Sequence, residues 1–270
     1  MKKLAINYEN VLTIKEDLKR TLNETFKLLK NVGITSLDVR YDRFFENKSL
    51  YSEILIAGMN VSSVFYVGDL GVSENYAKEM EIVDFCAEHK IPYIMLLTKP
   101  KFDKVVDKDK YLSNVKQNLR RIVNYANIYN IKVGIENFGL QNSAFSSFEN
   151  VKNILNSVRG LYLVFDSGNF FLAGENPFVC YKELEDKISK VHLKDRGISN
   201  GKGRNEQTSI SGESTCVYPL GEGESNVLDI LNQMKESGVF FDCSLEFDFV
   251  AHDIFEDVER SAIYYYSEEA

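Results

Sequence analysis

The sequence predicts an α/β protein that folds as a single (β/α)8 barrel over residues 1–270. Eight short apolar runs alternate with longer segments of helical period, as expected for repeated strand–helix units and a parallel sheet. The apolar runs are nearly continuous, which indicates strands buried on both faces. An open doubly wound sheet would share these features. The closed barrel is favoured because no Gly-x-Gly-x-x-Gly motif follows the first run, and because residues of metal-ligand type close four successive runs.

The predicted strands are short and rich in β-branched and aromatic residues, which favour extended structure. In chain order they are residues 4–7, 36–40, 61–67, 93–97, 132–136, 161–166, 189–193 and 242–246.

Six of the intervening segments place apolar residues on one face of a helix. Two of them begin with capping-box pairs, Thr13 with Glu16 and Ser146 with Glu149. A seventh segment, 44–59, is less regular and predicts only a weak helix. The six regular helices are predicted at residues 14–30, 73–89, 111–129, 146–157, 226–237 and 254–266.

The segment 196–224 is predicted to be a long loop, because it is rich in Gly, Ser, Asn and charged residues. Loops of this length in a compact domain are usually functional or disordered. Since this one follows the seventh strand, it should lie over the mouth of the barrel. Within it, the sequence Gly-Lys-Gly-Arg at 201–204 leaves two interpretations open: a basic lid over a phosphorylated substrate, or a solvated loop.

The composition excludes several classes of partner. A net charge of −8 and a pI near 5.1 argue against nucleic acid, because phosphate binding needs a positive surface. The four cysteines are scattered without CxxC spacing, so neither a disulfide framework nor a zinc ribbon is indicated. The first apolar run breaks at Asn7 and Glu9, too early for a signal peptide, and no run approaches the roughly 20 residues of a membrane span. We therefore expect a soluble cytoplasmic protein without membrane partners.

The residues that close four successive predicted strands are Glu136, Asp166, His192 and Glu246. An unpaired carboxylate at the end of a buried strand is costly, so something should neutralise it. In a parallel barrel the four side chains would converge, and three carboxylates with one imidazole suit a divalent cation. The alternative is that each acidic residue forms a salt bridge at its own strand end.

Such a cation would leave positions for two adjacent substrate oxygens, as in a 2-hydroxy carbonyl compound. It would polarise the carbonyl and stabilise the enediolate that forms when a base removes the neighbouring proton. Glu136 and Glu246 lie on strands that are not neighbours, so they are the natural pair for deprotonation from one face and reprotonation from the other.

The motifs around these residues make the chain similar to the sugar phosphate isomerase/epimerase superfamily, the xylose isomerase-like TIM barrels. The resemblance is strongest over residues 132–247. The motifs are Glu136-Asn137, Asp166-Ser167-Gly168-Asn169, His192-Leu193-Lys194-Asp195, Pro219-Leu220-Gly221-Glu222-Gly223 and the final Glu246.

The resemblance implies that Glu136, Asp166, His192 and Glu246 bind one metal ion, expected to be Mn2+, with Mg2+, Co2+ or Zn2+ as alternatives. It implies that Glu136 and Glu246 also act as acid and base, and that Asn169 and Lys194 face the substrate. For Lys194, a structural ion pair is the alternative. The related apurinic-site endonucleases use several more histidines than the three of this chain, so a nuclease is disfavoured.

The sequence thus predicts a divalent-metal-dependent isomerase or epimerase of a sugar or sugar phosphate, which acts by proton abstraction next to a carbonyl. A metal-dependent dehydratase of the inosose or 3-dehydroshikimate type is the first alternative, because it begins with the same proton abstraction. A non-catalytic sugar-binding barrel is the second. The expected partner is a small sugar or polyol, and the chain could also form a homo-oligomer.

Overall fold

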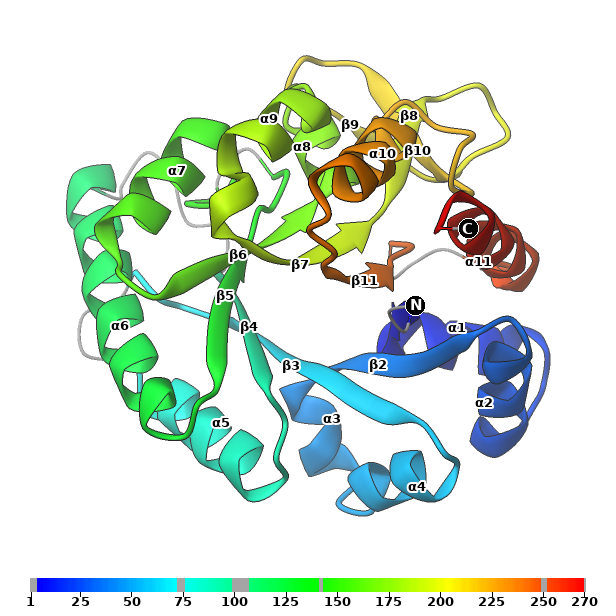
Figure 1. Cartoon of the computed structure of the whole chain (residues 1–270), viewed down its shortest axis with the longest axis horizontal. Coiled ribbons are helices and arrows are strands. Elements are labelled where there is room, and N and C mark those ends of the chain that lie inside the picture. The colour runs from blue at the N-terminus through cyan, green and yellow to red at the C-terminus, as the bar shows by residue number, and fades with distance from the viewer. Residues whose placement is uncertain (1–3, 72–75, 99–106, 141–142, 249–251, 270) are drawn as a thin grey trace.

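The computed structural model describes residues 4–71, 76–98, 107–140, 143–248 and 252–269. Its centre is a closed barrel of eight parallel strands with helices around the outside (Figure 1), which confirms the predicted (β/α)8 fold. The barrel order is β1-β11-β7-β6-β5-β4-β3-β2. The strands are β1 (Leu4–Asn7), β2 (Ile34–Arg40), β3 (Asn60–Gly68), β4 (Tyr93–Thr98), β5 (Lys132–Glu136), β6 (Leu161–Asp166), β7 (Ile188–Leu193) and β11 (Asp242–Leu245).

The helices cover the outer face of the strands, and their apolar faces contribute to one continuous core. No helix among the described residues is long and apolar enough to cross a membrane. The helices are α1 (Tyr8–Asp17), α2 (Leu22–Asn31), α3 (Tyr41–Glu46), α4 (Leu50–Ile56), α5 (Ala77–Glu88), α6 (Lys108–Ile128), α7 (Phe148–Ser157), α8 (Ser167–Leu172), α9 (Pro177–Leu184), α10 (Val227–Ser237) and α11 (Phe255–Glu269), with a 3-10 turn at Glu185–Lys187.

The first predicted helix, 14–30, is in fact two helices. α1 begins directly after β1, because the Asn7 side chain accepts a hydrogen bond from the Glu9 amide and caps the helix there. The capping box lies at Thr21 and Glu24 in front of α2, not at Thr13, which is inside α1. The apolar period continues across the break, so the sequence pattern did not reveal it.

Three further helix predictions need correction. The cap of α7 is Ser147, one residue after the predicted Ser146. The weak helix 44–59 is divided into α3 and α4. The start of the predicted helix 73–89 lies partly outside the described residues, and α5 runs from Ala77 to Glu88.

Residues 196–224, predicted as a loop, contain regular structure. Three strands, β8 (Asp195–Ile198), β9 (Arg204–Thr208) and β10 (Ser214–Tyr218), form an antiparallel sheet in the order β8-β10-β9. Figure 1 shows this sheet beyond the end of β7 and next to α8. Its inner strand β10 is mostly buried, whereas β9 is partly exposed and has no apolar alternation. Because the segment is polar, its sequence resembles a loop although it forms a small sheet.

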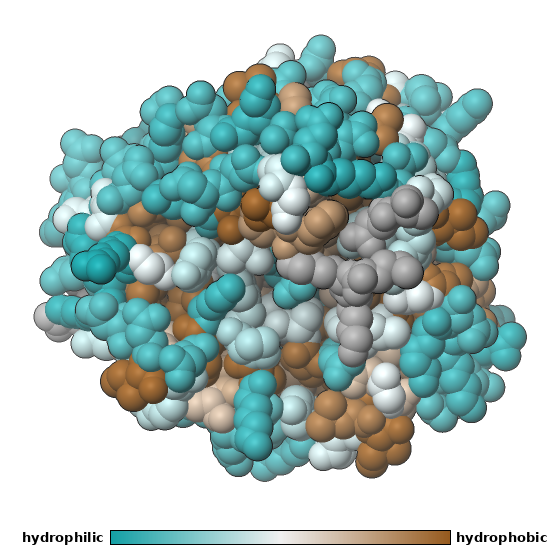
Figure 2. All heavy atoms as spheres, viewed as in Figure 1, coloured by the Kyte–Doolittle hydropathy of each residue, from teal (hydrophilic) through white to brown (hydrophobic). Residues whose placement is uncertain are grey.

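The face of the molecule in Figure 2 is mainly hydrophilic, with hydrophobic residues scattered between the polar ones. Scattered apolar side chains are normal on a protein surface and indicate no binding site by themselves. The features that position chemistry lie inside the barrel mouth.

Candidate metal centre and active site

The structure brings the four predicted ligands together. Strands β5, β6, β7 and β11 are consecutive neighbours in the barrel, and each supplies one residue at or just beyond its carboxyl end. All four side chains are buried, and one ligand atom from each lies within 4.8 Å of the others. The four residues are Glu136, Asp166, His192 and Glu246.

The distances fit a divalent cation. His192 Nδ1 lies 2.6 Å from Glu136 Oε1 and 2.8 Å from Glu246 Oε2. Two ligand atoms about 2.1 Å from a metal and at right angles to each other are about 3 Å apart, so these atoms are spaced like adjacent ligands. Asp166 Oδ1 accepts a hydrogen bond from the Asn169 amide, and the buried Asp166 Oδ2 is paired with the Lys194 ammonium. Three oxygens and one nitrogen at this spacing form a suitable donor set.

The pKa values of the two glutamates are shifted in opposite directions. Burial, reinforced by the charge of Glu246, raises the pKa of Glu136 to about 7. Burial would also raise the pKa of Glu246, but Lys194 and His192 outweigh it and lower that pKa to about 2. Two carboxyl groups whose pKa values are driven apart are typical of paired acid and base roles.

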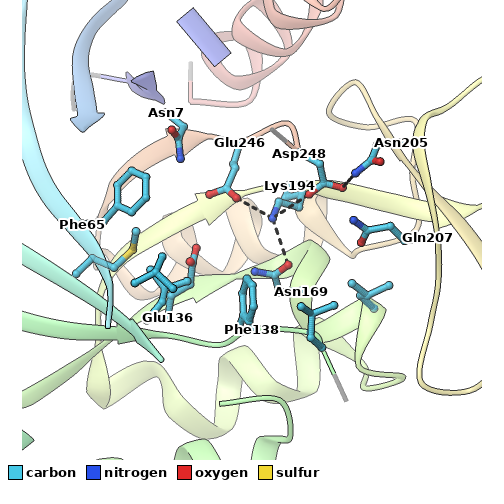
Figure 3. A pocket seen from close by; sticks show the side chains of 16 residues that line it. Asn7, Phe65, Glu136, Phe138, Asn169, Lys194, Asn205, Gln207, Glu246 and Asp248 are labelled. Carbon is cyan, nitrogen blue, oxygen red and sulfur yellow. Dashed lines mark hydrogen bonds and ion pairs between the residues drawn. The ribbon is translucent and has the colours of Figure 1, made fainter. Parts of the chain in front are cut away.

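Lys194 and Asn169, predicted to face the substrate, lie beside this cluster. The Lys194 ammonium is 2.8 Å from Glu246 Oε1 and 2.9 Å from Asp166 Oδ2, and it donates a hydrogen bond to Asn169 Oδ1 at 3.2 Å. Figure 3 shows Lys194 at the centre of the pocket, between Glu246, Asp248 and Asn169. Lys194 also forms ion pairs, the alternative role considered for it, and its partners are Asp166, Glu246 and Asp248.

These residues open into a cavity of about 220 Å³. A concave site with a few polar groups on an apolar lining is typical of small-molecule binding. One wall is apolar and includes Phe65, Val67, Met95, Leu97, Phe138, Leu140 and Leu172. The polar lining consists of Asn7, Glu136, Asn169, Lys194, Asn205, Gln207, Glu246 and Asp248, and Gly139 also lines the cavity.

The family model described as xylose isomerase-like TIM barrel matches residues 68–256, which include all four candidate ligands. The chain belongs to this family. No curated protein matches its sequence.

Several solved structures share the barrel. A probable 3-DHS dehydratase, AsbF, from Bacillus anthracis has a TM-score of 0.74 at 15% identity, over 97% of each chain. D-Psicose 3-epimerase from Clostridium cellulolyticum H10, solved with D-tagatose, has a TM-score of 0.72 at 10% identity, over 99% of this chain and 97% of that one. The IOLI protein with a bound zinc atom has a TM-score of 0.71 at 18% identity, over 100% of this chain and 96% of that one. At these identities the likeness establishes the fold.

Two of the barrel family's motifs have a clear structural role here. Asn137 links the ends of β5 and β6: its side chain donates to the Asp166 carbonyl and accepts from the Asp166 amide, each at 2.8 Å. The Asp195 carboxylate accepts hydrogen bonds from the amides of Gly221, Gly223 and Ser225 at 2.8–3.1 Å. A Cβ at position 223 would lie 2.4 Å from Asp195 Oδ1, so glycine is needed for this close approach.

Asp248 is a pocket residue that the sequence reasoning missed. Its Oδ1 is 3.5 Å from the Lys194 ammonium, and its Oδ2 pairs with Arg196 and accepts from Asn205 at 2.8 Å. Through these contacts it joins the small sheet to the barrel. Its position two residues after Glu246 was the available signal, because alternate residues of an extended segment point to the same side.

The remaining candidates lie away from the pocket. Arg204 pairs with Asp257 at 2.8 Å and, with Lys202, lines a different surface hollow, which disfavours the basic-lid interpretation. His89 ends α5 and its Nδ1 contacts the Phe85 carbonyl. His252 has a side chain 71% exposed and faces Asp17. As expected from sequence, neither histidine joins the cluster.

Proposed function

We propose that this protein is a divalent-metal-dependent isomerase or epimerase of an uncharged sugar or polyol. The observation that carries the proposal is the position of Glu136 and Glu246. Both line the cavity, and both lie within 2.8 Å of the same His192 nitrogen. Two carboxylates held beside one cation site and open to the substrate can remove a proton and return one.

Glu136, Asp166, His192 and Glu246 would hold the metal ion. When bound, the ion supplies Lewis-acid polarisation of a substrate carbonyl. Mn2+ is the cation we propose, because hard carboxylate oxygens dominate the donor set. Mg2+, Co2+ and Zn2+ satisfy the same set, and a zinc atom is bound in the IOLI protein.

Within this site, Glu136 and Glu246 are proposed to carry protons to and from the substrate carbon. In the metal-free protein, burial raises the pKa of Glu136 to about 7. Once the ion is bound, a carboxylate that ligates it through one oxygen can present the other to the substrate proton. Lys194, through its contact with Glu246, holds that carboxylate ionised and presents an ammonium to a developing oxyanion. Asn169 and Asn205 offer amide groups to substrate hydroxyls.

The charges in the cavity favour a neutral substrate over a sugar phosphate or a carboxylate such as dehydroshikimate. Lys194 is the one cation among the described lining residues, and carboxylates already lie within 3.5 Å of it on three sides. An added anion would face Glu136, Glu246 and Asp248, and only the bound metal ion would offset their charge. The apolar wall, by contrast, suits the C–H face of a sugar ring.

A screen with Mn2+ and D2O tests the proposal. Ketoses, inososes, sugar phosphates and dehydroshikimate would each be incubated with the protein and followed by NMR. We expect solvent deuterium at a single carbon next to the carbonyl of a neutral ketose or inosose, together with an epimer or isomer. A product that has lost water would instead identify a dehydratase. If the protein neither exchanges deuterium into any substrate nor binds a metal ion, the remaining interpretation is a non-catalytic barrel.

A further inference from the structure

A second charged cluster lies inside the barrel, one layer below the candidate metal ligands. Asp38 on β2 and Lys190 on β7 are both buried, with side chains 0% and 3% exposed. Their Oδ1 and Nζ atoms are 2.6 Å apart. In the barrel order β1 and β11 separate these two strands, so the pair forms across the interior. Ser62 and Ser63 also donate hydrogen bonds to Asp38 Oδ1, each at 2.6 Å.

Packing does not explain this pair. Barrel interiors are usually filled by branched apolar residues, and replacing a buried ion pair by apolar residues of similar size is often neutral or stabilising. A Lys–Asp pair in this position therefore suggests a role beyond folding. Its three donors also fix the carboxylate orientation, since all of them bind Oδ1 and leave Oδ2 without a hydrogen bond.

The free oxygen faces His192. Asp38 Oδ2 lies 3.4 Å from His192 Nε2, and neither atom has a hydrogen-bond partner. Lys190 and His192 are two residues apart on β7, so both point into the barrel, with Asp38 reaching both. The opposite ring nitrogen, Nδ1, is the one that lies beside Glu136 and Glu246.

We propose that Asp38, held in place by Lys190, is a positioning residue for His192. It accepts a hydrogen bond from Nε2–H and so directs Nδ1 to the metal site. The inference rests on the proposed metal site. A histidine that ligates through one nitrogen needs its other nitrogen protonated and its ring held, and a carboxylate partner does both. Asp38 thereby acts on the metal only through the ring.

A pair of double variants separates positioning from folding. Asp38→Leu/Lys190→Met and Asp38→Asn/Lys190→Met both remove the buried ion pair and conserve volume, but only Asn keeps an acceptor for Nε2–H. We expect both to fold, with thermal transitions near that of the wild type. By calorimetric titration with Mn2+, the Leu variant should bind about 10–100-fold more weakly than wild type, the usual cost of losing such a partner. The Asn variant should recover most of the affinity. Leu193→Met, a volume-conserving change on the outward side of β7, is the control and should bind like the wild type.

Equal Mn2+ affinity in both double variants and the wild type would overturn the inference while leaving the metal site intact. A direct readout does not depend on the variants folding or on metal. In the metal-free wild type, 15N-histidine NMR should show a slowly exchanging, low-field Nε2–H signal for His192, and its absence would also overturn the inference. If that signal is present but neither Mn2+ nor Zn2+ binds, the ring is positioned as proposed and the proposed metal-dependent function fails.

Discussion

The two walls of the barrel mouth differ in what the fold requires of them. On β3 and β4 the cavity lining is apolar, with Phe65, Val67, Met95 and Leu97, and these side chains pack with their neighbours like any core. On β5, β6, β7 and β11 the lining is charged and buried, which opposes folding unless the charges compensate one another. The first wall therefore stabilises the protein and shapes a site. The second is retained at a cost that a bound cation would offset.

The largest expected effect comes from removing one ligand on the charged wall. Asp166→Ala should abolish tight Mn2+ binding. The variant should still fold, because Lys194 keeps Glu246 and Asp248 as partners, but with a lower melting temperature, because the cap of α8 is lost. Calorimetric titration and a thermal melt measure the two properties. Met95→Leu, a volume-conserving change on the apolar wall, is the control and should bind Mn2+ normally. Wild-type affinity in the Asp166 variant would contradict the proposed ligand set.

Next in size are the two glutamates. Glu136→Gln and Glu246→Gln keep an oxygen for the metal but remove the base, so turnover should fall by about 10²–10⁴-fold while substrate still binds. One of the two variants should still exchange the substrate proton with solvent without forming product, because only one face has lost its base. Normal turnover of both variants at saturating Mn2+ would leave the proton carriers to be sought elsewhere, first at Lys194.

Metal addition should stabilise the charged wall directly. At a free Mn2+ concentration about one hundred times Kd, the free energy of unfolding should rise by about 2.7 kcal/mol, since only the folded state presents the site. Denaturant titration with Mn2+ and with EDTA measures the increment. Met95→Leu should keep it and Asp166→Ala should lose it. An equal increment in both would place the cation outside this cluster.

The smallest effect is expected on the apolar wall. Val67→Ala removes two methyl groups that line the cavity, and losses of this kind are worth about 1–3 kcal/mol in a hydrophobic site. We expect a higher KM with Mn2+ affinity unchanged. A shift in Mn2+ affinity instead would show that the two walls are coupled.

The same contrast explains what the sequence could predict. Glu136, Asp166, His192 and Glu246 were recognisable because each ends an apolar run, and parallel strands bring such ends together. The apolar wall is indistinguishable in sequence from ordinary strand core. Asp38 was not recognisable either, because its partner Lys190 is 152 residues away and meets it only when the barrel closes.

The sequence pattern did not reveal helix starts and a strand that depend on polar contacts rather than on the spacing of apolar residues. Asn7 starts α1 earlier than the pattern indicates, and Asp166 caps the short helix α8 with the carboxylate that also faces the metal site. Strand β9 is polar throughout and partly exposed. It pairs with the buried β10 through its backbone and through contacts of the Ser214 and Thr215 side chains, so its own sequence resembles a loop.

The hydrogen bonds that the Asp195 carboxylate accepts from three backbone amides have a practical consequence for redesign. Its carboxylate joins the start of β8 to the amides at 221–225, so these hydrogen bonds hold the two ends of the inserted sheet together. The segment 199–213, which contains β9 and its flanking turns, can therefore be exchanged in redesign, and it brings Asn205 and Gln207 to the cavity lining. Segments of other lengths and sequences that keep Asn205, and with it the hydrogen bond to Asp248, should alter selectivity without displacing Lys194.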